Sequence, residues 1–116
     1  MTTLTITVPN NWLDYCADAS ISDTLNDHAG GRLYRKGDEQ QSLAWLEACI
    51  ALNAAPRKRS GTTVTISIAA ARAIADDLRW WGTLRSGRLN GSMITAAHAR
   101  QCMNACTKIE QQLAGA

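Results

Sequence analysis

Threonine or serine alternates with aliphatic residues over two segments of the chain, residues 3–8 and 63–68. This alternation is typical of a β-strand with one buried face, because successive side chains point to opposite sides of a strand. The two segments are sixty positions apart and match almost residue for residue. We therefore expect two short strands that pair with each other in a small sheet.

A helical pattern follows the first predicted strand. Pro9 suits the opening turn of a helix, where its missing N–H costs nothing. The expected apolar stripe comprises Trp12, Leu13, Cys16 and Ala19 or Ser20. We expect residues 28–31 to form a turn, because they end in two glycines.

A second helical pattern follows the second predicted strand. Ser67 can accept the free amide hydrogens of the next turn and is therefore the expected cap, and Gly82 is the expected stop. The expected apolar stripe comprises Ala71, Ile74, Ala75, Leu78 and Trp81. The face of this helix that carries the stripe should pack on the sheet.

Each half of the chain contains one further predicted helix. In the first half, Asp38 is the candidate cap and Pro56 ends the helix, with the following residues expected to face inward: Leu43, Trp45, Leu46, Cys49 and Ile50. In the second half, Ile94 and Thr95 resemble a hydrophobic staple and cap. The apolar face of that last helix comprises Cys102, Cys106, Ile109 and Leu113.

These elements predict an α+β fold in a single domain, 1–116, with two strands in a small sheet and about four helices on one side of it. The order strand–helix–helix occurs twice, so the chain is a candidate duplication of half-repeats 1–57 and 58–116. The basic segment 57–61 would join them. A two-stranded sheet leaves open edges, which can pair with another chain. Both a monomer and a homodimer therefore stay open.

The formal net charge of +2 divides unevenly along the chain. Residues 1–30 hold four Asp and no Lys or Arg, whereas residues 57–100 hold eight Lys or Arg against two Asp. The chain is thus acidic at its start and basic in its second half. The fold decides whether these become two opposed surfaces or pack against each other within one molecule.

The segment 79–91 combines two adjacent Trp with three Arg and three Gly. Adjacent helical positions point about 100° apart, so Trp80 should be at least partly exposed if Trp81 continues the apolar stripe. Trp and Arg dominate binding hot spots, and they also suit single-stranded nucleic acid. The alternative is that Trp80 covers the end of the helical layer. The candidate partner-binding residues are Arg57, Lys58, Arg59, Arg79, Trp80, Arg85 and Arg88.

The candidate metal ligands form a weaker pattern. His98, Cys102 and Cys106 fall on one helical stripe, and Cys16, Cys49 or His28 could complete a tetrahedral zinc site. However, Ile109 and Leu113 extend the same stripe, and free Cys packs as a small apolar residue. We therefore expect core packing, no metal and no cofactor.

Catalytic chemistry has little support in the sequence. A Cys–His nucleophilic pair would need a third orienting group, and nothing supplies one. The Asp14–Asp18 and Asp23–Asp27 pairs could serve acid–base chemistry or bind a divalent metal, but a solvated acidic face explains them as well. Phosphate-loop, dinucleotide-binding and nucleophile-elbow motifs are absent from the chain. We predict that the protein is not an enzyme.

The sequence also carries expectations about location. No stretch approaches the ~18–20 apolar residues of a membrane helix. Residues 1–11 lack the basic and apolar regions of a signal peptide. Four sparse cysteines without a secretion signal favour reduced thiols and a cytoplasmic protein.

In style the chain resembles small phage or mobile-element proteins. It is one short domain that opens MTTLTI, feeds a strand into a capped helix, repeats that pattern at 63–71 and has no cofactor motif. The resemblance implies an inhibitor of host defence, similar to anti-CRISPR proteins, which acts by occupying the surface of a host protein or protein–nucleic-acid complex. The sequence thus favours a small non-catalytic protein-binding module. The alternative is a small nucleic-acid-binding protein that uses the basic second half.

Overall fold

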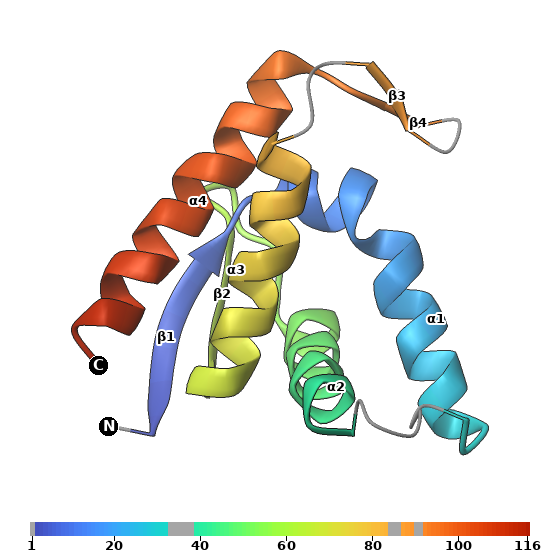
Figure 1. Ribbon diagram of the computed structural model, residues 1–116. Coiled ribbons are helices and arrows are strands. Elements are labelled where there is room, and N and C mark those ends of the chain that lie inside the picture. The colour runs from blue at the N-terminus through green and yellow to red at the C-terminus, as the bar shows by residue number, and fades with distance from the viewer. Residues whose placement is uncertain (1, 33–38, 84–86, 90–91) are drawn as a thin grey trace.

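Each strand of the main sheet leads into helices along the chain (Figure 1). The computed structural model describes residues 2–32, 39–83, 87–89 and 92–116, with the backbone alone over 87–89 and 92–94. In chain order the elements are β1 (Thr3–Val8), a π-helical turn η1 (Trp12–Cys16), α1 (Asp18–Ala29), α2 (Glu39–Ala54), β2 (Thr62–Ser67), α3 (Ile68–Thr83), β3 (Gly87–Leu89), β4 (Ser92–Ile94) and α4 (Ala96–Ala114). The predicted α+β class is confirmed.

The main sheet consists of β1 and β2, which pair antiparallel. Its aliphatic side chains are buried together with Thr62, and the other threonines alternate with them on the exposed face. On that face the hydroxyl of Thr5 lies 2.8 Å from that of Thr65. Both predicted strands, their pairing and their buried face are therefore confirmed. A second antiparallel pair, formed by β3 and β4 with three residues in each strand, lies between α3 and α4.

Helices cover only the aliphatic face of the main sheet. α3 and α4 pack closely on each other and both contact β1, while α2 contacts β2 and α3. α1 packs mainly against α2 and η1, at the opposite side of the molecule from α4 (Figure 1). α1 thus lies at the edge of the helical layer, where α2 and η1 hold it.

Side chains from two helices reach the outer edges of the sheet. Gln112 of α4 donates from Nε2 to the carbonyl oxygen of Thr5 at 2.8 Å. On the other edge, the amide of Ser67 donates to Glu47 Oε2 of α2 at 2.7 Å. Each edge is therefore engaged at one position within the chain, and a homodimer through sheet extension stays a prediction.

Two predicted helix caps are confirmed. Ser67 Oγ accepts from the amide of Ala70 at 3.1 Å, and Thr95 Oγ1 accepts from the amide of His98 at 3.1 Å. The predicted stop at Gly82 is wrong, because α3 continues to Thr83. A Cβ at Gly82 would lie 2.9 Å from the backbone nitrogen of Met103, so this glycine serves the close approach of α3 to α4.

The start of the first helix also differs from expectation. The amide of Ala17 bonds to the carbonyl of Trp12 at 2.8 Å, which closes a π-helical turn. The extra residue in this turn shifts the buried positions, so Ala17 and Ile21 are buried while the predicted Ala19 and Ser20 are exposed. The expected turn at 28–31 begins later, since α1 runs to Ala29.

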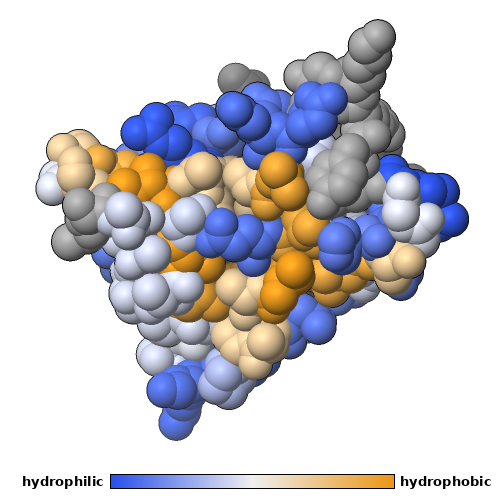
Figure 2. Space-filling view, turned by 90° about the horizontal axis from the view of Figure 1, so that it is seen from below, coloured by the Kyte–Doolittle hydropathy of each residue, from blue (hydrophilic) through white to orange (hydrophobic). Residues whose placement is uncertain are grey.

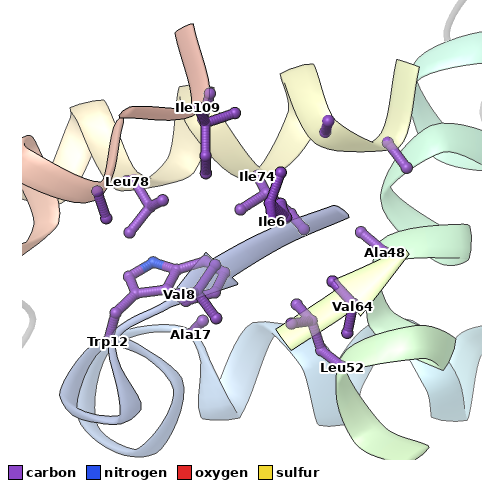
Figure 3. Packing of buried hydrophobic residues seen from close by; sticks show 14 of the residues in the cluster. Ile6, Val8, Trp12, Ala17, Ala48, Leu52, Val64, Ile74, Leu78 and Ile109 are labelled. Atoms are coloured by element: carbon purple, nitrogen blue, oxygen red, sulfur yellow. The ribbon is translucent and has the colours of Figure 1, made fainter. Parts of the chain in front are cut away.

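The core gathers aliphatic side chains from the sheet and the surrounding helices. Figure 3 shows Ile6 and Val64 of the two strands, Ile74 of α3 and Leu52 of α2 directed into one interior. Trp12 of η1 is fully buried there. Burying one such side chain contributes about 1.5–3 kcal/mol, which explains why the short η1 turn is held in place.

The inward face predicted for α2 is only partly correct. Leu46 and Cys49 are buried, and Trp45 is partly buried. Leu43 and Ile50 are instead each 50% exposed. Because α2 carries apolar residues around most of its circumference, its pattern does not specify one face. The cap predicted at Asp38 lies outside the described residues, and the predicted end before Pro56 is confirmed.

The surface is mixed in character. Viewed from the end that holds both termini, apolar side chains gather at the centre and hydrophilic ones border them (Figure 2). Among the described residues, none of the helices has the length and apolar character needed to cross a membrane.

Candidate functional site

Trp80 is the aromatic side chain that the fold leaves most available near the end of α3. It is 49% exposed, and its ring meets that of Trp81 edge to face at a centroid distance of 5.0 Å. Trp81 is partly buried and packs against the core. The predicted division of roles between the two Trp is therefore confirmed, although exposure alone does not assign a partner.

A groove of about 650 Å³ runs beside Trp80, between the η1–α1 segment and α3. Its aromatic lining comes from Tyr15, Trp80 and Trp81. Its acidic lining consists of Asp14, Asp18, Asp23, Asp27 and Asp77. The lining set includes no Lys, Arg or His among the described residues. The groove thus joins a large aromatic surface to an acidic one.

Asp77 forms the inner, acidic wall of this groove. Its Oδ2 accepts a hydrogen bond from Trp12 Nε1 at 2.8 Å, which ties α3 to η1. Burial raises the pKa of the Asp77 carboxyl, while hydrogen bonding from Trp12 and Trp81 acts in the opposite direction. The net rise means that the effect of burial outweighs that of these two donors. A cation bound in the groove would act in the same direction as the donors and favour the ionised carboxylate.

The carboxylates on the other wall differ in their partners. Asp14 pairs with Arg57 at 3.3 Å, and Asp27 pairs with Arg32 at 3.8 Å. Asp18 and Asp23 are exposed and have no ion pair within the part of the chain that the structure describes. These two carboxylates are therefore available to a cationic partner.

Arg57 and Arg79, two of the arginines predicted to act with Trp80, are each engaged in an ion pair within the chain. Arg79 is adjacent in sequence, but its guanidinium pairs with Glu110 of α4. Arg57 pairs with Asp14 at the edge of the groove. Arg85 lies outside the described residues, and Arg88 is described only by its backbone on β3.

Lys58 and Arg59 belong to a different part of the surface. They lie in the turn before β2, where Lys58 and Gly61 exchange backbone hydrogen bonds. Arg59 lines a separate pocket with residues of α4, and neither cation lines the groove beside Trp80. The five predicted residues whose side chains the structure describes are thus distributed over at least two surfaces.

The acidic wall is the feature that sequence reasoning missed. The four aspartates of residues 14–27 are all exposed, as expected for a solvated face, and they also line the groove opposite Trp80. Their signal was the absence of any Lys or Arg in residues 1–30. Their position opposite α3 depends on long-range packing, which that signal does not contain.

The candidate metal ligands pack as separate groups. The thiols of Cys16 and Cys102 influence each other's pKa, whereas Cys106 Sγ lies 3.5 Å from Glu110 Oε1. The His98 ring stacks on Tyr15 at a centroid distance of 6.1 Å. Over the described residues, no group of three or more His, Cys, Asp or Glu could hold a metal ion. All four cysteines are free thiols.

Comparisons with protein-family models, with curated proteins and with solved structures each found no match for this chain.

Proposed function

We propose that this protein is a small non-catalytic protein-binding module that contacts its partner through the groove beside Trp80. The observation that carries the proposal is a half-exposed Trp standing over a carboxylate-lined groove. A large aromatic side chain gives much contact area for little lost conformational freedom, which is why Trp is enriched at interface hot spots. The fold itself buries Trp81 and Trp12 more deeply and needs Trp80 less.

The lining of the groove favours a basic segment of the partner. The described lining holds five aspartates and no cation, and Asp18 and Asp23, which have no ion pair among the described residues, make the groove attractive to Lys or Arg side chains. A guanidinium can also stack on the face of an exposed indole such as Trp80. Asp18 and Asp23 would then pair with cations of the partner. Cations of the partner would then lie beside Trp80, while Arg57 and Arg79 pair with carboxylates of this chain.

The partner that we propose is a host defence protein. The resemblance in style to small phage-encoded anti-defence proteins supports this class, and the module would inhibit its target in the cytoplasm by occupying its surface. A stoichiometric inhibitor needs a rigid contact surface and no chemistry. The bond between Trp12 and Asp77 supports such rigidity, because it ties both walls of the groove together.

The test is capture of a partner from a nuclease-treated bacterial lysate with wild-type and variant baits. Trp80→Ala and Asp23→Lys should each reduce the recovery of the same captured protein about tenfold or more, as expected for a hot spot and for a reversed charge. Ile50→Ala and Asp76→Lys are the matched controls. Ile50 is an equally exposed apolar residue on α2, and Asp76 is an exposed carboxylate outside the groove.

A second measurement tests the charge of the occupant directly. Titration with a peptide of alternating Arg and Gly should change the tryptophan fluorescence, and a Glu–Gly peptide should not. Recovery that falls equally in the controls, or equal responses to both peptides, would remove the groove as the contact site.

A further inference from the structure

A second concave surface lies outside the groove and has the opposite chemistry. It is a pocket of about 490 Å³ built from three segments that are distant in sequence. Residues 7–11, at the end of β1, form one side, and the turn at residues 59–61 forms another. The third side is a face of α4 with Gln101, Asn104 and Lys108, which recur at helical spacing.

Hydrogen bonds hold the two loop segments of this pocket together. Asn10 donates from Nδ2 to the carbonyl of Lys58 at 2.6 Å, and its Oδ1 accepts from Thr62 Oγ1 at 2.8 Å. Gly61 has a φ of 124°, and a Cβ there would lie 2.8 Å from the carbonyl oxygen of Val8. A residue with a side chain would force the turn away from β1, so the glycine fixes this wall of the pocket.

Several side chains that line the pocket can donate hydrogen bonds. Arg59 and Lys108 have no ion pair among the residues that the structure describes, and no Asp or Glu belongs to the described lining. Gln101 Oε1 accepts from Asn11 Nδ2 at 3.0 Å. This bond uses the oxygen of the Gln101 amide and not its nitrogen, which remains a possible donor. The hydroxyl of Ser60 and the amide of Asn104 add two more neutral donors.

We infer that this pocket binds a phosphate group. Two cations and several neutral donors around one concavity, without a carboxylate, match the charge and the hydrogen-bond acceptors of a phosphate oxyanion. A free phosphate or nucleotide and the backbone of a nucleic acid present this same chemistry. The pocket shares no lining residue with the groove beside Trp80, so the inference stands apart from the proposed function.

The binding test uses inorganic phosphate as the probe and NMR of the labelled protein as the readout. Titration should shift the side-chain amide signals of Gln101 and Asn104 in a saturable manner. The double variant Arg59→Ala/Lys108→Ala should weaken the affinity about tenfold or more, because charge-assisted hydrogen bonds are lost. Chloride at equal ionic strength is the control for salt.

The matched control variant is Arg32→Ala/Arg72→Ala, which removes the same charge at exposed positions outside the pocket. Its affinity should stay within about twofold of wild type, since distant exposed charges are screened. An equal loss in both double variants would show attraction by net charge alone and overturn the inference. Unshifted amide signals with every probe would overturn it as well.

Two further probes distinguish the source of the phosphate. A mononucleotide and a single-stranded oligonucleotide are titrated under the same conditions. If the site serves a nucleic acid, the oligonucleotide binds more tightly than the mononucleotide and its affinity falls as the salt concentration rises. The slope of log affinity against log salt concentration is then smaller by about one or two in the Arg59→Ala/Lys108→Ala variant. If it serves a free phosphate compound, the mononucleotide binds at least as well as the oligonucleotide.

Discussion

Trp12 Nε1 and Asp77 Oδ2 lie 2.8 Å apart, and the hydrogen bond between them connects the π-helical turn to the middle of α3. Trp12 is fully buried, and Asp77 is half-buried at the inner wall of the groove. The bond therefore couples the stability of the core to the shape of the candidate site. The bond also gives the buried indole N–H of Trp12 an acceptor, which avoids the cost of an unpaired buried polar group.

Removal of this donor should destabilise the protein. Trp12→Phe keeps an aromatic ring in the core but leaves Asp77 without the Trp12 hydrogen bond, at an expected cost of about 1.5–3 kcal/mol for a bond to a charged group. Urea unfolding at neutral pH measures the change. Trp45→Phe is the matched control, because it removes a neutral bond from Trp45 Nε1 to Thr24 Oγ1 at 3.1 Å. That variant should lose only about 0.5–1.5 kcal/mol. Equal losses would show that charge adds nothing to the Trp12 bond.

The raised pKa of Asp77 predicts a pH dependence of stability. Burial raises this pKa from its ordinary value of 3.8, so in the window just above 3.8 the folded state binds more protons than the unfolded state. The Asp77 contribution to the free energy of unfolding should therefore fall as the pH rises through this window and stay constant above the raised pKa. Below 3.8 both states are protonated and the penalty is absent.

Asp77→Asn isolates that contribution, since the amide cannot ionise. The difference in unfolding free energy, variant minus wild type, should increase as the pH rises from 3.8 and then level off. Urea unfolding of both proteins in the same series of buffers gives this difference. A difference that decreases with pH would mean that the two indole donors outweigh burial, contrary to the assigned cause.

The alternation of Thr with aliphatic residues was sufficient to predict the sheet. In the observed register Thr5 lies opposite Thr65, its counterpart at the sixty-residue offset, and Leu4 and Ile6 face Ile66 and Val64. Such pairing about a central residue is what two related strands would form around an approximate two-fold axis. The duplication stays a prediction, because the helices of the two halves pack differently: α3 and α4 lie together, whereas α1 and α2 contact each other less.

The features that could not be predicted depend on long-range packing. The exposure of Trp80 follows from the local rotation of about 100° between adjacent helical residues. The position of Asp18 and Asp23 opposite it requires α1 to fold back beside α3, and no local pattern encodes this. In the same way, Arg79 has an alternative partner in Glu110, which is thirty-one residues away and could not be identified from spacing.

Trp80 and Leu78 should differ in their contribution to stability, although only two positions separate them on α3. Leu78 is fully buried, so Leu78→Ala should cost about 2–5 kcal/mol through lost burial and the cavity. Trp80→Ala loses mainly its edge-to-face contact with Trp81, worth about 0.5–1.5 kcal/mol. Urea unfolding of both variants tests this. A loss from Trp80→Ala as large as that from Leu78→Ala would assign Trp80 to the core and remove it as a contact residue.

The thiols should be unreactive in the folded protein. Burial raises the pKa of Cys49 and of Cys102 from 9.0 to about 12, so their thiolate fraction at pH 8 falls about 1000-fold. Burial also raises the pKa values of Cys16 and Cys106. A thiol-specific chromogenic disulfide reagent should react slowly at pH 8 in buffer and rapidly with all four thiols in concentrated urea.

The variant Cys16→Ser/Cys106→Ser sharpens this test, because it retains only the two cysteines with the highest pKa values. Its reaction in buffer should follow the rate of unfolding, since Cys49 and Cys102 are buried and react only when exposed. Circular dichroism checks that the variant is folded. A rapid reaction of either remaining thiol in the folded variant would show that this side chain is accessible, and would contradict the core packing assigned to Cys49 and Cys102.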